Sequence, residues 1–143
     1  MDNVVKEVKI MRFFLYALII RAFLCSTALA QTDWIPIAGT DDKVWHVKPG
    51  SLEISQTKGQ TPIAVVIGRT GDKKTRQIQV YKWYVSLADC QRELGKVVSL
   101  NVDGSYAFEN DFVFSSGNVA SAMAESICGA YFYQVKYREK KGM

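Results

Sequence analysis

Histidine is nearly absent from this sequence, because His46 is the single example among 143 residues. The chain has no HExxH pair and no CxxC pair, so neighbouring residues supply no zinc-binding motif. The GRTG segment at 68–71 is not followed by Gly-Lys-Ser or Gly-Lys-Thr, which excludes a phosphate-binding loop of that type. These absences remove the commonest sequence signatures of metallohydrolases and nucleotide-binding enzymes.

Long hydrophobic runs are confined to the amino terminus. Residues 13–20 read FFLYALII, and residues 22–30 read AFLCSTALA after the intervening Arg21. A basic start, an apolar run and a small-x-small end at Ala28 and Ala30 are typical of a secretory signal peptide. We predict that residues 1–30 are a signal peptide cleaved between Ala30 and Gln31, with Met11 as a candidate for the true start.

Two other interpretations of the amino terminus stay open. Arg21 interrupts the apolar run, which leaves an uncleaved anchor as one alternative. Each apolar half is nevertheless only about half of the roughly 20 residues that a membrane-spanning helix needs. The second alternative is a lipoprotein with Cys25 as the lipidated residue, although Leu24 stands where a small residue is required. Cleavage is the interpretation we favour, and it leaves no stable transmembrane segment.

Cysteine is scarce in the predicted mature chain, where only Cys90 and Cys128 remain. In an exported protein an even pair is most simply a disulfide, and two free buried thiols are the alternative.

The excess of basic over acidic residues is small. Eighteen basic and 14 acidic residues give the whole chain a net charge of +4, and removing residues 1–30 lowers that charge. The mature chain therefore gives no argument for binding nucleic acid.

The sequence after residue 30 predicts an α+β domain at 31–135, in which antiparallel strands are followed by one helix. β-branched and aromatic segments separated by turn residues indicate a sheet of about six strands. The clearest strand signals are at 43–48, 62–70, 76–87, 96–102 and 105–115, and those at 31–39 and 52–57 are weaker. We expect the helix to pack on the sheet and a disulfide to hold it there.

The last third of the chain carries the strongest local signals. Asp103 and Gly104 predict a two-residue type I′ hairpin. Four aromatic residues of the returning strand share one face and should lie over the core, namely Tyr106, Phe108, Phe112 and Phe114. Apolar spacing predicts a helix over 119–131 with Cys128 on its packing face. Residues 136–143 are expected to form a frayed basic tail.

Few residues are candidates for chemistry. A lone histidine such as His46 is expected to be a structural or surface group. Glu109 and Asp111 are spaced on one strand face, as paired carboxylates would be, but we favour solvated strand residues. We therefore predict a protein that is not an enzyme, with no catalytic residue, no metal site and no cofactor.

Basic and large aromatic residues are the candidates for binding. Lys73, Lys74 and Arg76 gather at one predicted turn. A solvated turn is the interpretation we favour, and an electrostatic docking patch is the alternative. The three tryptophans, Trp34, Trp45 and Trp83, are each expected in the core, whereas an exposed group of them would mark a protein interface. A second copy of the chain is one candidate partner, which would give a homodimer.

Several segments in this order support a family resemblance. A first strand with Trp34 is followed by VKPGSLE at 47–53, an aromatic strand that ends in Asp89-Cys90, and FVFSSGNVASAMAESIC at 112–128. This order resembles the surface-adhesin protein E-like proteins of Gram-negative bacteria, from about residue 34 to residue 128. The most specific segments are Asp89-Cys90 and residues 115–128.

The resemblance implies an exported, non-enzymatic protein with a small antiparallel sheet, a packed C-terminal helix and a disulfide. Only Cys90 and Cys128 correspond residue by residue to the family pattern. The namesake adhesin binds host matrix and serum proteins. We therefore expect a binding module of the cell envelope, in the periplasm or on the outer surface, that is adhesin-like toward host proteins. A periplasmic accessory or inhibitor protein is the alternative, and a small hydrolase is a third hypothesis.

Overall fold

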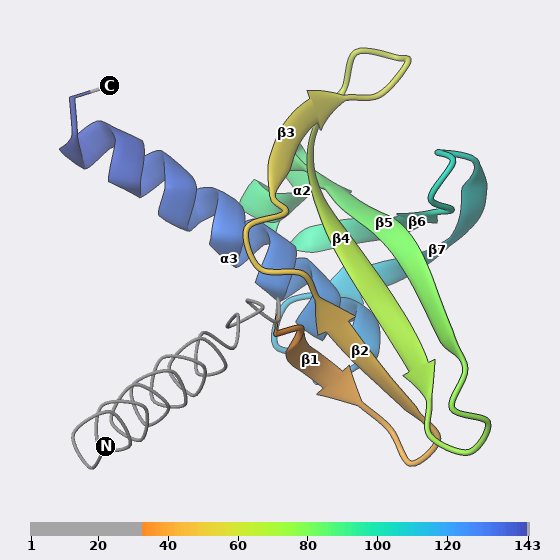
Figure 1. Cartoon of the computed structure of the whole chain (residues 1–143). Coiled ribbons are helices and arrows are strands. Elements are labelled where there is room, and N and C mark those ends of the chain that lie inside the picture. Colours follow the sequence, from red (N-terminus) through yellow and green to blue (C-terminus); the bar gives the residue numbers. More distant parts are fainter. Residues whose placement is uncertain (1–32, 143) are drawn as a thin grey trace, which may run out of the picture. The chain divides into compact units, whose positions relative to one another are not determined.

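The structure is a computed structural model that describes residues 33–142, and it contains a seven-stranded antiparallel sheet with one long helix packed on it (Figure 1). The predicted α+β fold is therefore confirmed. The predicted signal peptide, with its cleavage site at Ala30 and Gln31, lies outside the described residues. The elements are β1 (Ile35–Gly39), β2 (Lys43–Val47), β3 (Glu53–Gln56), β4 (Pro62–Asp72), β5 (Ile78–Ser86), α2 (Leu87–Arg92), β6 (Leu94–Leu100), β7 (Tyr106–Val113) and α3 (Val119–Lys140).

The sheet has the strand order β1-β2-β4-β5-β6-β7, and β3 also pairs with β4. The long strand β4 accommodates two neighbours on one edge, since its first residues pair with β3 and its last residues pair with β2. Ser51 lies between these two partners. Its hydroxyl donates to the Lys48 carbonyl at 2.7 Å and accepts from the Ile67 amide at 3.0 Å, which satisfies backbone groups where the strands part.

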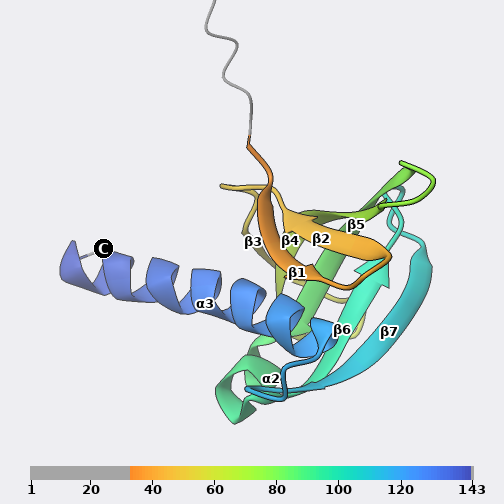
Figure 2. The same cartoon turned by 90° about the horizontal axis from the view of Figure 1, so that it is seen from below.

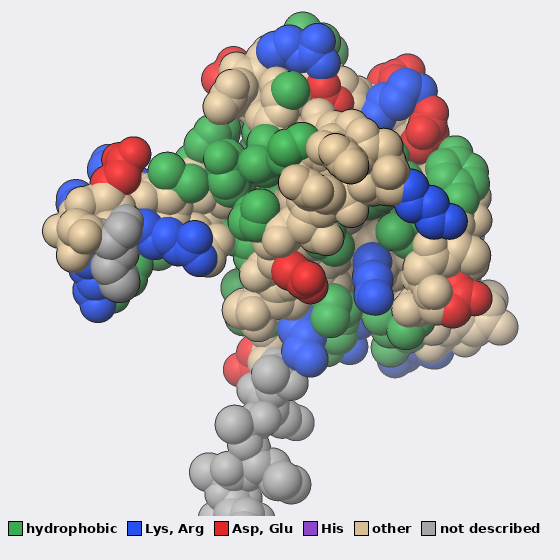
Figure 3. All heavy atoms as spheres, turned by 90° about the horizontal axis from the view of Figure 1, so that it is seen from above, with side chains coloured by type: hydrophobic (Ala, Val, Ile, Leu, Met, Phe, Trp, Pro, Cys, Tyr) green, Lys and Arg blue, Asp and Glu red, His purple; other side chains and the backbone are tan. Residues whose placement is uncertain are grey.

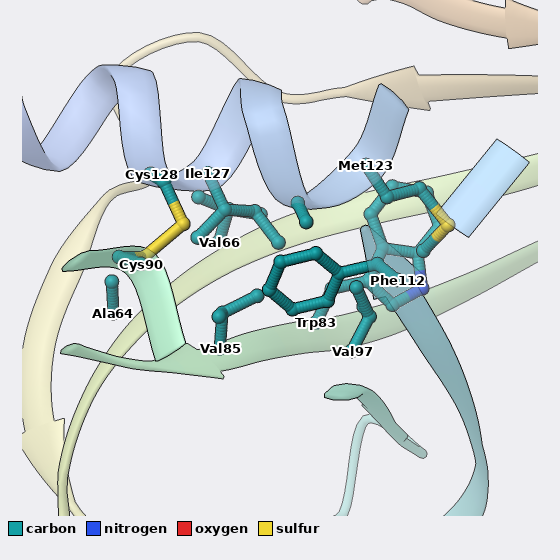
Figure 4. Packing of buried hydrophobic residues seen from close by; sticks show 11 residues of the cluster. Ala64, Val66, Trp83, Val85, Cys90, Val97, Phe112, Met123, Ile127 and Cys128 are labelled. Atoms are coloured by element: carbon teal, nitrogen blue, oxygen red, sulfur yellow. A yellow bond between two sulfur atoms is a disulfide. The ribbon is translucent and has the colours of Figure 1, made fainter. Parts of the chain in front are cut away.

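One face of the sheet is covered by α3 and contains the core (Figure 2). Strand alternation points Trp83, Val85 and Val97 toward the helix, and Met123 and Ile127 reach down from α3 to meet them (Figure 4). Figure 4 labels ten of the buried residues, which are Ala64, Val66, Trp83, Val85, Cys90, Val97, Phe112, Met123, Ile127 and Cys128. Burial of these side chains provides the main stabilisation of the fold.

The disulfide joins α2 to α3 beside this core. Cys90 and Cys128 are bonded, with their Cα atoms 5.4 Å apart, so the predicted bond is confirmed. The short helix α2 was not predicted, because the sequence pattern carried the preceding strand as far as residue 87. The Ser86 side chain accepts from the Asp89 amide at 3.1 Å and begins α2, and Glu93 ends it with φ of 61°.

Two predictions for β7 were wrong. The connection from β6 is not a type I′ turn, because the Gly104 amide donates to Asn101 and only Gly104 has positive φ there. A register shift between Ser99 and Leu100 accompanies this longer loop. Tyr106 and Phe108 also do not lie over the core, since they are 61% and 40% exposed. The register shift turns Tyr106 to the face of the sheet opposite α3. Phe108 stays on the α3 side but extends past the part that α3 covers, whereas Phe112 is buried beneath the helix.

The predicted C-terminal boundary of the helix was wrong as well. α3 continues to Lys140, so residues 136–140 of the expected frayed tail are helical. No proline or glycine interrupts residues 131–140. Arg138 and Lys140 lie in the last turn, where positive charge interacts favourably with the helix dipole. The Lys141 amide completes the end by donating to the carbonyls of Tyr137 and Arg138.

Candidate functional site

A groove of about 500 Å³ lies between the first turns of α3 and the exposed part of the sheet surface that α3 faces. We call it the α3 groove. Three aromatic residues, Trp45, Tyr81 and Phe108, come from β2, β5 and β7 and line it. Tyr81 and Phe108 contact each other edge to face, with ring centroids 5.4 Å apart. Apolar walls of this kind, with a few polar groups among them, are typical of ligand sites.

Trp83 also lines the α3 groove and is fully buried. Its six-membered ring lies over Gly68, where a Cβ atom would overlap the ring. Its indole Nε1–H has no hydrogen-bond acceptor among the described residues, and neither has the hydroxyl of Ser99, its neighbour across β5 and β6. A buried donor without an acceptor costs about 1–3 kcal/mol of stability.

The amino-terminal end of α3 forms part of the same groove. Asn118 lines it and caps the helix, because its side-chain oxygen accepts from the Ser121 amide at 2.7 Å. The first turn of α3 contains no acidic residue, so the partial positive charge of the helix end is not neutralised there. Asn110 adds an amide on the β7 side. The groove therefore offers hydrogen-bond donors beside its aromatic walls.

A second hollow, of about 410 Å³, adjoins the α3 groove. The two share Lys43, Thr70 and Tyr81, and the second continues along β4 and β5 to Gln77 and Ile78. Together they form an elongated depression across the sheet rather than a closed chamber. This shape suits an extended ligand, such as a segment of polypeptide.

The residues of the predicted docking patch are not in the α3 groove. The Lys73 ammonium donates to the Thr40 carbonyl at 2.6 Å, and Lys74 pairs with Asp42 at 2.6 Å, so both lysines tie the β4–β5 turn to the β1–β2 turn. Lys73 and Arg76 line a separate hollow of about 300 Å³. The docking role of Lys73, Lys74 and Arg76 stays a prediction.

His46 lines this separate hollow on the face of the sheet opposite α3. Burial lowers the pKa of His46, and the nearby charge of Arg69 lowers it further, so the imidazole is neutral at neutral pH. The Arg69 guanidinium lies over the Trp34 ring, 4.6 Å from its centroid. Trp34 thus contributes to the sheet surface through a cation–π contact.

The carboxylates of β7 pair with one lysine. Lys96 hydrogen-bonds to Glu109 and lies 3.6 Å from Asp111. The hydrogen bond to Glu109 raises the pKa of Lys96, and the charges of Glu109 and Asp111 add to this effect. These side chains are largely solvated, so the ion pairs contribute little to stability.

The described part of the chain shows no cluster of three or more His, Cys, Asp or Glu side chains that could hold a metal ion. Between residues 33 and 142, no helix combines the length and the apolar character required to cross a bilayer.

Sequence reasoning missed the α3 groove, although it gave one relevant signal. Residues two apart on a strand share a face, and Tyr81 and Trp83 of β5 both lie on the α3 side of the sheet. Strand alternation does not show where α3 begins to cover the sheet. Because α3 leaves part of this face uncovered, Tyr81 and Phe108 lie at the surface of a groove.

Comparisons with protein-family models, with curated proteins and with solved structures gave no match to this chain. The resemblance to surface-adhesin protein E-like proteins therefore stays a prediction.

Proposed function

We propose that this protein is an exported, non-enzymatic binding module of the bacterial cell envelope that holds a segment of a partner protein in the α3 groove. The observation that supports a binding role best is the groove itself, whose walls combine Trp45, Tyr81 and Phe108 with polar side chains. Aromatic walls supply contact area, and the polar side chains supply hydrogen bonds to a peptide backbone.

The lining of the groove favours holding a ligand over chemical conversion. Its polar groups include the amides of Asn110 and Asn118 and the hydroxyl of Thr70, together with Lys43 and Asp111. Amides and hydroxyls make hydrogen bonds without changing protonation state near neutral pH. A ligand would thus be oriented by hydrogen bonds and stacked against rings.

The disulfide supports the exported location within this proposal. Such bonds persist in oxidising compartments such as the bacterial periplasm and the cell surface, and they are rare in the cytosol. The family resemblance adds host matrix and serum proteins as the class of partner, which makes the proposed module adhesin-like.

The binding proposal is tested with purified host matrix and serum proteins immobilised on a biosensor. We expect Phe108→Ser to weaken binding at least about tenfold, because it removes an aromatic wall of the groove. Tyr106→Ser is the matched control, since Tyr106 is an exposed aromatic of the same strand that does not line the groove. Equal losses in both variants, or binding that neither changes, would contradict a role for the groove.

The location is tested by protease treatment of intact cells. An adhesin-like module must be reachable from outside, so the treatment should remove it while a periplasmic marker survives. Protection until the outer membrane is opened would instead favour a periplasmic accessory or inhibitor protein. The two tests are independent, because the groove can bind a partner in either location.

A further inference from the structure

The carboxyl-terminal end of α3 projects beyond the sheet. The buried residues of α3 end at Cys128, and no residue of 129–140 is buried. Figures 1 and 2 both show α3 running past the edge of the sheet, with its last turns beside no other described element. We call residues 132–141 the projecting segment. A helical segment without packing is marginally stable in water, so this one is expected to have a partner.

The projecting segment exposes aromatic and aliphatic side chains. Phe132, Tyr133, Val135 and Tyr137 are all exposed, and Tyr133 is 72% exposed. Tyr133 and Tyr137 stack along the helix with ring centroids 6.4 Å apart. Such a concentration of apolar surface on a helix that leaves the domain marks an interaction site.

The same segment is strongly basic. Lys136, Arg138, Lys140 and Lys141 surround a single carboxylate, Glu139. Figure 3 shows Lys and Arg side chains around the projecting end of α3, at the left of the view. Lys141 lies over the Tyr137 ring, 4.8 Å from its centroid, and no ion pair among residues 33–142 involves these four bases. The charge is therefore available to an anionic partner.

The aromatic and basic residues are interleaved around the helix rather than separated into two faces. Consecutive residues of an α-helix point about 100° apart, so Phe132 and Tyr133 lie on different sides and Lys136 lies between them. A partner groove that contacts one apolar stripe would leave part of the rings uncovered, because Tyr133 and Tyr137 lie on another side of the helix from Phe132. Two copies of the segment would bring eight basic side chains together, which disfavours a dimer through this segment.

We propose that the projecting segment is a docking surface for an anionic lipid membrane. Tyrosine and phenylalanine rings sit at the headgroup level of a bilayer, and lysine and arginine extend along the surface to lipid phosphates. Four basic residues beside exposed aromatic rings attract this end of the helix to anionic lipid at the membrane surface. The segment would hold the domain at a membrane and leave the α3 groove free, so the two proposals stand independently.

The test is flotation of the purified, exported, disulfide-bonded protein with vesicles of phosphatidylglycerol and phosphatidylcholine. We expect binding to mixed vesicles that is at least about tenfold stronger than to pure phosphatidylcholine, and that weakens when salt rises from about 0.1 M to about 0.5 M. Lys136→Glu/Lys140→Glu should weaken binding at least about tenfold, and Phe132→Ser/Tyr133→Ser should weaken it severalfold. All variants share one amino terminus, so differences among them report on α3.

The matched control is Gln56→Glu/Lys58→Glu/Gln60→Glu, which makes the same change in net charge on exposed residues of β3 and the turn after it. It should bind like the unchanged protein within about twofold. Equal binding to both vesicle types overturns the proposal, as does an equal loss in the control. Concentration-dependent self-association that the α3 variants abolish, without vesicle binding, would instead assign the segment to a second copy. Circular dichroism verifies that each variant is folded.

Discussion

The two ends of α3 continue one helix but contact very different surroundings. The first part, residues 119–128, buries Met123, Ala124 and Ile127 against the sheet and is bonded through Cys128. The projecting segment, residues 132–141, carries large apolar side chains that stay exposed. The difference shows that the helical pattern alone does not decide whether an apolar residue is buried or exposed. The extent of the sheet beneath the helix decides it.

Small residues distinguish the packed part in particular. Ala120, Ala124 and Cys128 form a row that lets the helix backbone approach the strands, and Ala64 and Gly68 do the same from β4. The projecting segment has tyrosines and long basic side chains instead. The packed part is therefore expected to govern stability, and the projecting segment to govern association.

Removing the disulfide should cause the largest loss of stability, because the bond holds the packed part of α3 to α2. Cys90→Ser/Cys128→Ser opens a loop with a sequence separation of 38, and we expect a loss of about 4 kcal/mol in the free energy of unfolding. Urea denaturation measures it. Reductant should destabilise the unchanged protein and leave the double variant unaffected. If both proteins unfold at the same urea concentration under oxidising conditions, the bond does not anchor α3.

Truncating one apolar residue in each part should give the next largest difference. Ile127→Ala removes a fully buried side chain beneath α3 and should cost about 3 kcal/mol. Val135→Ala removes an exposed side chain of the projecting segment and should change stability by less than about 0.5 kcal/mol. Urea denaturation of both variants gives the comparison, and similar losses would show that the two parts are equally packed.

A pair of glycine substitutions should give a smaller loss of stability than Ile127→Ala, and changes of opposite sign. Gly68→Ala places a methyl group against the Trp83 ring under the packed part and should cost about 2 kcal/mol. Gly129→Ala adds a methyl group that meets nothing within 4 Å, where the packed part ends, and should add up to about 1 kcal/mol through helix propensity. Thermal unfolding of the two variants should therefore shift in opposite directions. A shift in the same direction would contradict the structure at one of these glycines.

Much of the fold could be predicted from the sequence, because short stretches of residues show patterns that are typical of strands and helices. The β-branched run at 62–70 and the aromatic strand after it became β4 and β5, and the two cysteines of the expected mature chain became the disulfide. The short helix α2 was missed because six residues give no periodicity, and its start depends on one hydrogen bond to Ser86.

The candidate site was less predictable, since it depends on where distant elements meet. Strand alternation correctly placed Phe108 on the same face of β7 as Phe112. Burial of Phe108 did not follow, because α3 crosses the sheet nearer to Phe112. The C-terminal end of α3 could not be predicted for a related reason. Its last residues favour a helix by their own propensity, although they no longer pack on the sheet.

The position of α3 in the chain has a consequence for the timing of folding. α3 follows every strand that it contacts, namely β1, β4, β5, β6 and β7. During synthesis these strands emerge first, so the apolar side of the sheet stays uncovered until α3 arrives. The core can close, and the bond between Cys90 and Cys128 can form, only once α3 is available.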